Sequence, residues 1–342
     1  IGDRIAINMP NIPEQLFWTE ACKRLGIVYT PVFGGFSDKT LSDRIHNAGA
    51  RVVITADGGY RNAQIVAFKE AYTDPALDGY VPAETVVEIV QRTLGELAVP
   101  AEQARVILDG ARTAVANEIT LERSDVMRGV GRAIESIGGL SSAEASRIRT
   151  AIASALVATP ARVDIVVVVR HAAQADLLWR PERDRWAHEL TDRAEQKILA
   201  AARAAGHAVD SLAALMALPD SQFVAAIWAS SRPVPLDAEF PMFFIYTSGS
   251  TGKPKGVVHV HGGYLSGVSH TMRVAFDARA GDVMYVVADP GWITGQSYMI
   301  AGALATRVTT VIAEGAPVFP SAGRFASIIE RLKVNIFKAG VT

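Results

Sequence analysis

The chain begins with short apolar runs that alternate with segments whose apolar residues recur at helical spacing. The runs predict β-strands and the segments predict helices, an order that is typical of an α/β fold with a mostly parallel sheet. Asn11 is the predicted N-cap of the first helix and Gly26 its predicted end. The predicted strands are 4–9, 27–33, 51–56, 163–169 and 242–246, and the predicted helices in this part are about 12–25 and 39–48.

A different pattern fills the stretch from about residue 74 to 160. Strand signals vanish there, and apolar residues recur at helical spacing. We therefore expect residues 1–73 and 161–342 to form one α/β domain that is interrupted by a helical insertion at 74–160, with extra helices at about 186–230. We expect these helices to pack against other domains or subunits, and a decorative surface insert is an equal alternative. The predicted insertion helices are 85–97, 102–115, 122–137 and 142–157.

Composition narrows the class of protein. The chain has 342 residues, 49% hydrophobic content and a net charge of −1, so it can bury a large core and has no electrostatic bias toward nucleic acid or membrane. Its longest apolar run, 165–169, is far shorter than the ~20 residues that span a bilayer. No basic segment leads into an apolar one at the start, so we expect a cytoplasmic protein. The one cysteine, Cys22, is expected in the core on the side of Phe17 and Leu25.

The segment 246–256, in which YTSGSTGKPKG follows an apolar run, concentrates hydroxyls, glycines and lysines. Glycines allow the backbone to approach an anion closely, hydroxyls donate hydrogen bonds, and lysines supply the countercharge. This combination predicts a polyphosphate site at the carboxyl edge of a sheet. The candidate residues are Thr247, Ser248, Gly249, Ser250, Thr251, Gly252, Lys253, Lys255 and Gly256.

The composition of this loop is compatible with two other interpretations. Taken alone, a loop rich in glycine, serine and lysine is as often a solvated turn. A Walker-type P-loop of an NTPase needs four residues between its glycines and a hydroxyl residue after the lysine. Here Gly249 and Gly252 enclose only two residues and Pro254 follows Lys253, so the spacing disfavours that motif and leaves it a minor alternative.

The order TSGSTGKPKG resembles the phosphate loop of the adenylate-forming enzymes, which include acyl-CoA synthetases, luciferases and the adenylation domains of peptide synthetases. The segments GDRIAINMPNIPEQ, ITADGGYR and DVMYVVADPGWITGQSYMIAGALA are similar to the acetyl-CoA synthetase branch of that family. The large helical additions resemble the ligase part of a multifunctional propionyl-CoA synthase. The resemblance implies the large N-terminal α/β domain of such an enzyme, with mostly parallel sheets flanked by helices.

The same resemblance implies an activity. ATP, Mg²⁺ and CoA would be ligands, and a short acid such as acetate, propionate or 3-hydroxypropionate would form an acyl-adenylate and then a thioester. Trp292, Ile293 and Thr294 match positions of the acyl pocket, and Thr294 also matches the pantetheine channel. Arg61 and Gln64 match a CoA-binding run, although Gln64 stands where a basic residue is usual.

Other functional groups lie outside the candidate set. Gln296 stands where the family usually has histidine and cannot act as a titrating base. His259 and His261 have no third ligand at suitable spacing, so no metal site is predicted. The resemblance implies that the catalytic lysine and the C-terminal domain lie beyond Thr342, so no catalytic residue is assigned here. A non-catalytic interaction module on a ligase scaffold is the remaining alternative.

Overall fold

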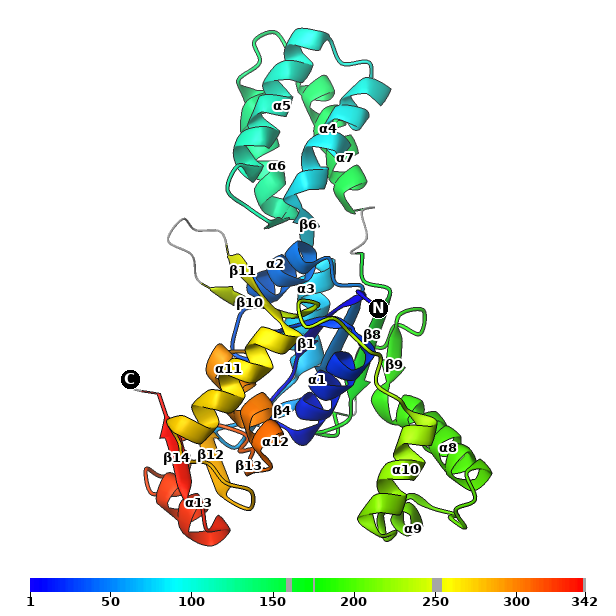
Figure 1. Ribbon diagram of the computed structural model, residues 1–342. Helices are drawn as coiled ribbons and strands as arrows, with labels where there is room; N and C mark the ends of the chain where they lie inside the picture. The colour runs from blue at the N-terminus through cyan, green and yellow to red at the C-terminus, as the bar shows by residue number, and fades with distance from the viewer. Residues whose placement is uncertain (158–161, 175, 248–253, 341–342) are drawn as a thin grey trace.

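A mostly parallel sheet lies at the centre of the protein (Figure 1). The computed structural model describes residues 1–157, 162–174, 176–247 and 254–340. Within them the central sheet has the strand order β11-β10-β2-β1-β3-β8-β9, and only β11 runs antiparallel to its neighbour. The predicted fold class, a mostly parallel sheet flanked by helices, is confirmed. The strands are β1 (Arg4–Asn8), β2 (Val28–Pro31), β3 (Val52–Ala56), β8 (Ile165–Val169), β9 (Asp184–Trp186), β10 (Pro241–Thr247) and β11 (Lys255–Val260).

Helices α1 (Pro13–Leu25) and α2 (Asp38–Ala48) connect the first three strands. Gly26 ends α1 in the left-handed conformation, as predicted. The prediction that Asn11 caps α1 is wrong, because Ile12 occupies the N-cap without a side-chain hydrogen bond and a proline at the start of the helix removes one free N–H. The Asn11 amide instead donates to the carbonyl oxygen of Ala288 at 3.3 Å. It therefore ties the segment after β1 to the distant segment after Val287.

The buried face of α1 differs from the predicted one. Cys22 is buried, as expected, and burial raises the pKa of its thiol to about 12. Its neighbours on this face are Gln15 and Thr19, whereas Phe17 is 62% and Leu25 48% exposed. At ~100° per residue Phe17 lies about 140° around the helix axis from Cys22, too far to share its face. Apolar character alone therefore misplaced these two side chains.

A second, smaller sheet lies beside the first, with the order β13-β12-β14 and all strands parallel. Met284 and Val286 of β12 pack against Met272 and Ile300 from two covering helices. The elements of this part are α11 (His261–Val274), β12 (Val283–Val287), the π-helix η2 (Gly295–Gly302), α12 (Ala303–Thr306), β13 (Thr309–Val311), α13 (Arg324–Leu332) and β14 (Ile336–Ala339).

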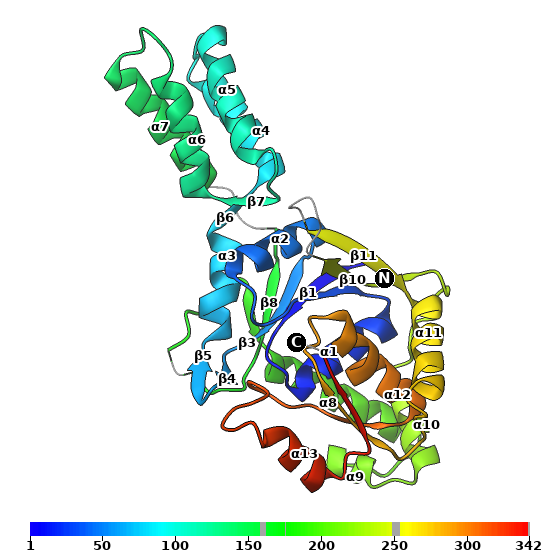
Figure 2. The ribbon, with the colours of Figure 1, turned by 90° about the vertical axis from the view of Figure 1, so that its left-hand side faces the viewer.

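Four helices form a bundle that projects from the central sheet (Figures 1 and 2). They have a core of their own, in which Val86, Ile107, Val130 and Ile152 are fully buried. The bundle begins at a two-stranded ribbon of β6 (Tyr80–Pro82) and β7 (Thr120–Glu122), so the expectation that 74–160 contains no strand is wrong. Each strand has three residues, too few to show an alternating pattern. The helices are α4 (Ala83–Glu96), α5 (Ala101–Val115), α6 (Arg123–Glu135) and α7 (Ser142–Val157).

A second helical unit lies on another side of the central sheet (Figure 1). Leu199, Leu215 and Ala226 form its small core. Within the described ranges, no helix of this unit or any other is long and apolar enough to cross a membrane. The unit comprises α8 (Ala187–Ala204), α9 (Leu212–Met216) and α10 (Asp220–Ser230), and the remaining elements are the hairpin β4 (Gly59–Arg61) and β5 (Gln64–Val66), the π-helix η1 (Lys69–Thr73) and α3 (Asp74–Asp78).

Because the four-helix bundle has a separate core, a substitution there should lower its own stability. Ile152→Ala removes a fully buried side chain and should reduce the free energy of unfolding by about 2–5 kcal/mol. Glu88→Ala, on the exposed face of α4, should change it by less than about 0.5 kcal/mol. Denaturant unfolding followed by circular dichroism measures both. An equal effect of the two variants would show that the bundle core does not stabilise the protein.

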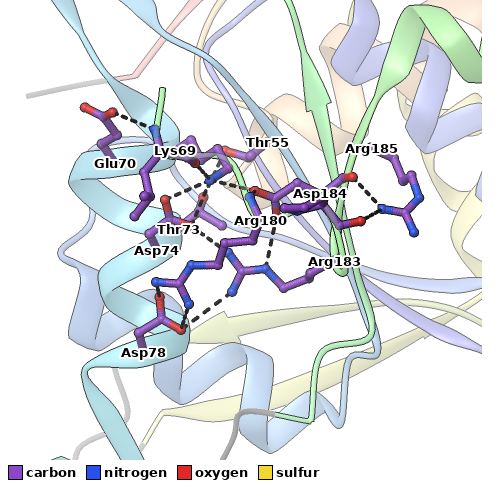
Figure 3. Close-up of polar contacts among 12 residues, drawn as sticks. Thr55, Lys69, Glu70, Thr73, Asp74, Asp78, Arg180, Arg183, Asp184 and Arg185 are labelled. Carbon is purple, nitrogen blue, oxygen red and sulfur yellow. Dashed lines mark hydrogen bonds and ion pairs between the residues drawn. The ribbon is translucent and has the colours of Figure 1, made fainter. Parts of the chain in front are cut away.

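A buried cluster of charged side chains joins η1 and α3, which precede the bundle, to the start of β9 (Figure 3). Lys69 of η1 is fully buried, and its Nζ lies 2.8 Å from Asp74 and 2.9 Å from Asp184. The same Nζ donates to the carbonyl oxygen of Leu178 at 2.6 Å. The cluster thus joins the segment before the bundle to the segment that follows β8.

Two arginines complete this cluster. Arg183 contacts Asp74 at 2.7 Å and Asp184 at 3.1 Å, and Arg180 contacts Asp78 at 2.7 Å. Burial raises the pKa of Asp184, but hydrogen bonds from Arg180 N, Lys69 and Arg183 outweigh it, so the pKa lies below its usual value. The carboxylate is therefore held in its ionised form.

Candidate functional site

A cavity of about 500 Å³ lies where the carboxyl ends of strands from both sheets meet. Segments that follow β1, β2 and β3 line one side, and segments that follow β12 and β13 line the other. Ligand sites of parallel α/β sheets lie at this edge, because side chains and backbone N–H groups of several loops converge there. The polar and aromatic lining residues used below are Asn11, Tyr60, Arg61, Asp289, Trp292 and Glu314.

Buried hydrogen bonds join the central sheet to the π-helix η2, which covers the second sheet. The hydroxyl of Tyr29, on β2, donates to Oε1 of Gln296 at 2.8 Å, and Nε2 of Gln296 donates to the carbonyl oxygen of Pro290 at 2.7 Å. Gln296 is buried, and both ends of its amide are paired. This geometry gives Gln296 a structural role in positioning the segment that contains Trp292.

A second bridge involves Glu314, which follows β13. One carboxylate oxygen accepts from the backbone N–H of Tyr60, and the other lies 2.8 Å from Nε2 of His171. The backbone N–H of His171 donates to the buried carboxylate of Asp57 at 2.8 Å. Glu314 therefore has partners at both oxygens, and its position is fixed from the central sheet.

Trp292 lies at the cavity with two other aromatic side chains. Its ring centroid is 6.0 Å from that of Phe33 and 5.5 Å from that of Phe36. The indole is half-exposed, and it faces the space between the two sheets. Ile293 and Thr294, the other predicted acyl-pocket residues, do not line this cavity. Of the three predicted acyl-pocket residues, only Trp292 therefore contributes to the wall of this cavity.

The predicted CoA-binding residues Arg61 and Gln64 face each other across the β4–β5 hairpin. Asn62 and Ala63 form the turn between them with φ values of 50° and 62°, as a tight two-residue hairpin turn requires. Arg61 lines the cavity, whereas the exposed Gln64 does not. The hairpin therefore presents one cation to the cavity.

Only the two ends of the predicted phosphate loop can be placed. Ser248, Gly249, Ser250, Thr251, Gly252 and Lys253 lie outside the described residues. Thr247 and Lys255 pair across β10 and β11, and both are exposed. A Cβ on Gly256 would lie 3.2 Å from the ring of Tyr246, so close packing against this ring favours glycine there.

One arginine connects the start of this loop to the cavity. The guanidinium of Arg44, on α2, lies 4.1 Å from the ring centroid of Phe36 and 5.7 Å from that of Tyr246. Phe36 packs against Trp292, so Tyr246, Arg44, Phe36 and Trp292 form a continuous row of contacts. Burial lowers the pKa of Arg44 to about 10. The sequence around Arg44 shows only a helical pattern and does not indicate this contact between Tyr246 and Phe36.

The two histidines that flank Val260 have separate surroundings. His259 stacks on Phe243 with ring centroids 4.6 Å apart, and its ring packs edge-on against Tyr264. Burial lowers the pKa of both His259 and His261, which favours neutral rings. Across the part of the chain that the structure describes, no group of three His, Cys, Asp or Glu side chains could hold a metal ion.

Asp289 is a cavity residue that sequence reasoning missed. It follows β12, and its Oδ1 accepts from the backbone N–H of Gly291 at 2.7 Å. Burial raises the pKa of Asp289 to about 7, while the Gly291 hydrogen bond and the positive charge of Arg61 oppose this rise. The available signal was its place directly after a buried strand and three residues before Trp292.

The family model of AMP-binding enzymes matches residues 1–126 and 141–340. The chain belongs to the AMP-binding enzyme family. This confirms the predicted adenylate-forming family, and the curated relatives below support its acetyl-CoA synthetase branch. The unmatched residues 127–140 of this AMP-binding family member fall within α6 and the connection to α7.

Curated relatives of this AMP-binding chain are acetyl-coenzyme A synthetases. The one from Methylobacillus flagellatus is 32% identical over 342 residues, which cover 100% of this chain and 35% of that protein. Acetyl-coenzyme A synthetase 2 from Pseudomonas aeruginosa is 32% identical over 344 residues with the same coverage of both proteins. The chain thus spans about a third of the length of the relatives it matches.

Proposed function

We propose that this chain supplies part of an AMP-forming acyl-CoA ligase that activates a short carboxylic acid. The observation that carries the proposal is the cavity of about 500 Å³ at the carboxyl edge of both sheets, joined by Arg44 and Phe36 to the strand that leads into the phosphate loop. The names of the relatives agree with this chemistry. A nucleotide at the loop and an acid at the cavity would lie next to each other.

Adenylation would use the loop and the cavity together. The carboxylate of the acid attacks the α-phosphate of ATP, and pyrophosphate leaves with Mg²⁺ as part of the nucleotide substrate. In such a displacement positioning and charge neutralisation provide most of the rate. Thr247 and Lys255 would flank the polyphosphate at the ends of the loop. The remaining candidates, Ser248 to Lys253, would contact it through hydroxyls, backbone N–H groups and a lysine.

Thioester formation would follow in the cavity. The thiol of CoA attacks the acyl carbonyl, and AMP leaves. Arg61 would attract a phosphate of CoA, since it is the cation that the hairpin presents to the cavity. Trp292, packed against Phe33 and Phe36, would wall off the acyl group and select short acids such as acetate, propionate or 3-hydroxypropionate. Propionate and 3-hydroxypropionate as substrates, and a place in a multifunctional propionyl-CoA synthase, are the more specific part of this proposal.

Acid-dependent exchange between ATP and labelled pyrophosphate tests the proposed function. We expect the full-length natural polypeptide to catalyse this exchange with at least one acid of the series acetate, propionate and 3-hydroxypropionate. We expect none without acid, because adenylation needs the attacking carboxylate. A reaction with ATP alone is the control. ATP hydrolysis without acid, in the absence of exchange, would contradict the proposal and favour an NTPase.

A further inference from the structure

The thioester step needs a group that accepts a proton. On the proposed function, a neutral thiol that attacks an acyl-adenylate must release its proton, since the thiolate is the reactive form. Gln296 cannot accept this proton, because an amide does not titrate near neutral pH and both its ends are paired. A carboxylate that lines the cavity is a suitable acceptor.

Asp289 has the geometry of such an acceptor. Its carboxylate lies at the cavity, and the Gly291 N–H fixes one oxygen at 2.7 Å. Among the described residues no hydrogen bond or ion pair engages the second oxygen, Oδ2. The side chain is half-buried, so it remains accessible from the cavity. One oxygen therefore holds the carboxylate in place while the other is available to a ligand.

The other charged or titratable groups of the cavity are less suited. Glu314 uses both oxygens, one with Tyr60 N and one with His171. Arg324 donates to backbone carbonyl oxygens, and the guanidinium of Arg61 has donors but no acceptor atom. Burial raises the pKa of Tyr285, which keeps its hydroxyl protonated.

We propose that Asp289 accepts the proton of the CoA thiol during thioester formation. The sulfur forms a bond to the acyl carbon, the bond from that carbon to the phosphate oxygen breaks, and AMP leaves with the electron pair. The thiol proton moves to Oδ2 of Asp289 and later passes to solvent. No oxidant or reductant is needed, and Arg61 at the same cavity stabilises the ionised carboxylate before the transfer.

The pH dependence follows from the state of Asp289. Its pKa of about 7 lies close to the pH at which a general base of this kind is most effective. The carboxyl group is protonated below this value and ionised above it. The rate of thioester formation should therefore rise as pH increases through about 7 and then level off. Glu314, His171, Arg61, Arg324, Tyr60 and Tyr285 are the other ionisable groups around the cavity, and the variant below separates their effects from that of Asp289.

The test uses Asp289→Asn in the full-length polypeptide. Asparagine keeps the oxygen that accepts from Gly291 N but cannot accept a proton. We expect thioester formation from preformed acyl-adenylate and CoA to fall by about 10²–10⁴-fold. We expect the rise near pH 7 to vanish, leaving only the rise near the ordinary thiol pKa of ~8.5. The acid-dependent ATP–pyrophosphate exchange does not involve the thiol, so it should fall by much less than the thioester rate.

Asp282→Asn is the matched control. Asp282 lies just before the other end of β12, where its oxygens accept from Arg279 N and the Asn335 amide, so the same chemical change occurs far from the cavity. Its thioester rate and pH profile should equal those of the wild type. The inference is overturned if Asp289→Asn retains the wild-type pH profile, or if it loses exchange and thioester formation equally. It is also overturned if the wild-type thioester step shows no rise near pH 7. If the wild type shows no acid-dependent exchange, the proposed function fails instead.

Discussion

Replacing Lys69 by methionine should lower the free energy of unfolding by about 3–5 kcal/mol. Lys69 is fully buried and contacts two carboxylates, those of Asp74 and Asp184. Methionine approximates the volume of the side chain but removes the charge and its hydrogen bonds. Asp74 and Asp184 would then share only the guanidinium of Arg183, and the carbonyl of Leu178 would lose its donor. Urea unfolding at neutral pH measures the loss.

Lys39→Met is a matched control for this substitution. Lys39 also contacts two carboxylates, Asp43 at 2.7 Å and Glu118 at 3.2 Å, but its side chain is 32% exposed. Water screens such pairs, so the loss should stay below about 1 kcal/mol. Similar losses in the two variants would contradict the view that burial of the Lys69 cluster determines its contribution.

The same cluster should make stability depend on pH. The pKa of Asp184 is lower in the folded protein than in the unfolded chain. Its contribution is therefore complete above the ordinary aspartate pKa of ~3.9 and is lost as pH falls through the folded value. Acid titration should destabilise the wild type through this region, and Lys69→Met should weaken that dependence.

Gly291→Ala should damage both the fold and the cavity. A Cβ at this position would overlap the backbone nitrogen and Cα of Phe33, and backbone atoms cannot rotate away as a flexible side chain can. Overpacking of this kind costs about 1–3 kcal/mol, and we expect the upper end of this range. The displaced segment contains Trp292, which lines the cavity, so acid-dependent exchange should fall by about 10²-fold. Thermal unfolding and pyrophosphate exchange measure the two effects.

Gly131→Ala provides the opposite case. Gly131 lies inside α6, and a Cβ there would meet nothing within 4 Å. Alanine favours a helix interior over glycine, so this variant should be stabilised by about 0.5–1 kcal/mol. If Gly291→Ala behaves like Gly131→Ala, the close approach of Gly291 to Phe33 is not a constraint on the segment.

The fold was largely predictable wherever a segment contains its own pattern. Helices α5 (Ala101–Val115) and α7 (Ser142–Val157) lie within a residue of their predicted bounds, because four or more turns repeat the helical spacing. Strands β6 (Tyr80–Pro82) and β7 (Thr120–Glu122) were not predicted. They are defined by pairing with each other across the α4–α5 segment, and three residues cannot show that preference.

The site was predictable to a smaller extent. Arg61 and Trp292 line the cavity, and the resemblance to known enzymes named both. Arg44 and Asp289 were missed, because their positions depend on contacts between distant segments. In the sequence Arg44 is an ordinary helix residue, whereas in the structure α2 positions it between Phe36 and Tyr246. The role of Asp289 depends on burial that no local pattern reveals.

The buried cluster around Lys69 bears on whether the four-helix bundle can be replaced by another folded module. The chain leaves the central sheet after Asp78 to form the bundle and returns to it at β8. Asp74 pairs with Arg183, and Asp78 pairs with Arg180 (Figure 3). These ion pairs hold the segment before the bundle beside the loop that follows β8. A folded module whose own ends lie close together could take the place of the bundle without stretching the sheet. We therefore expect this position to tolerate replacement of the bundle by another compact module while the cavity remains intact.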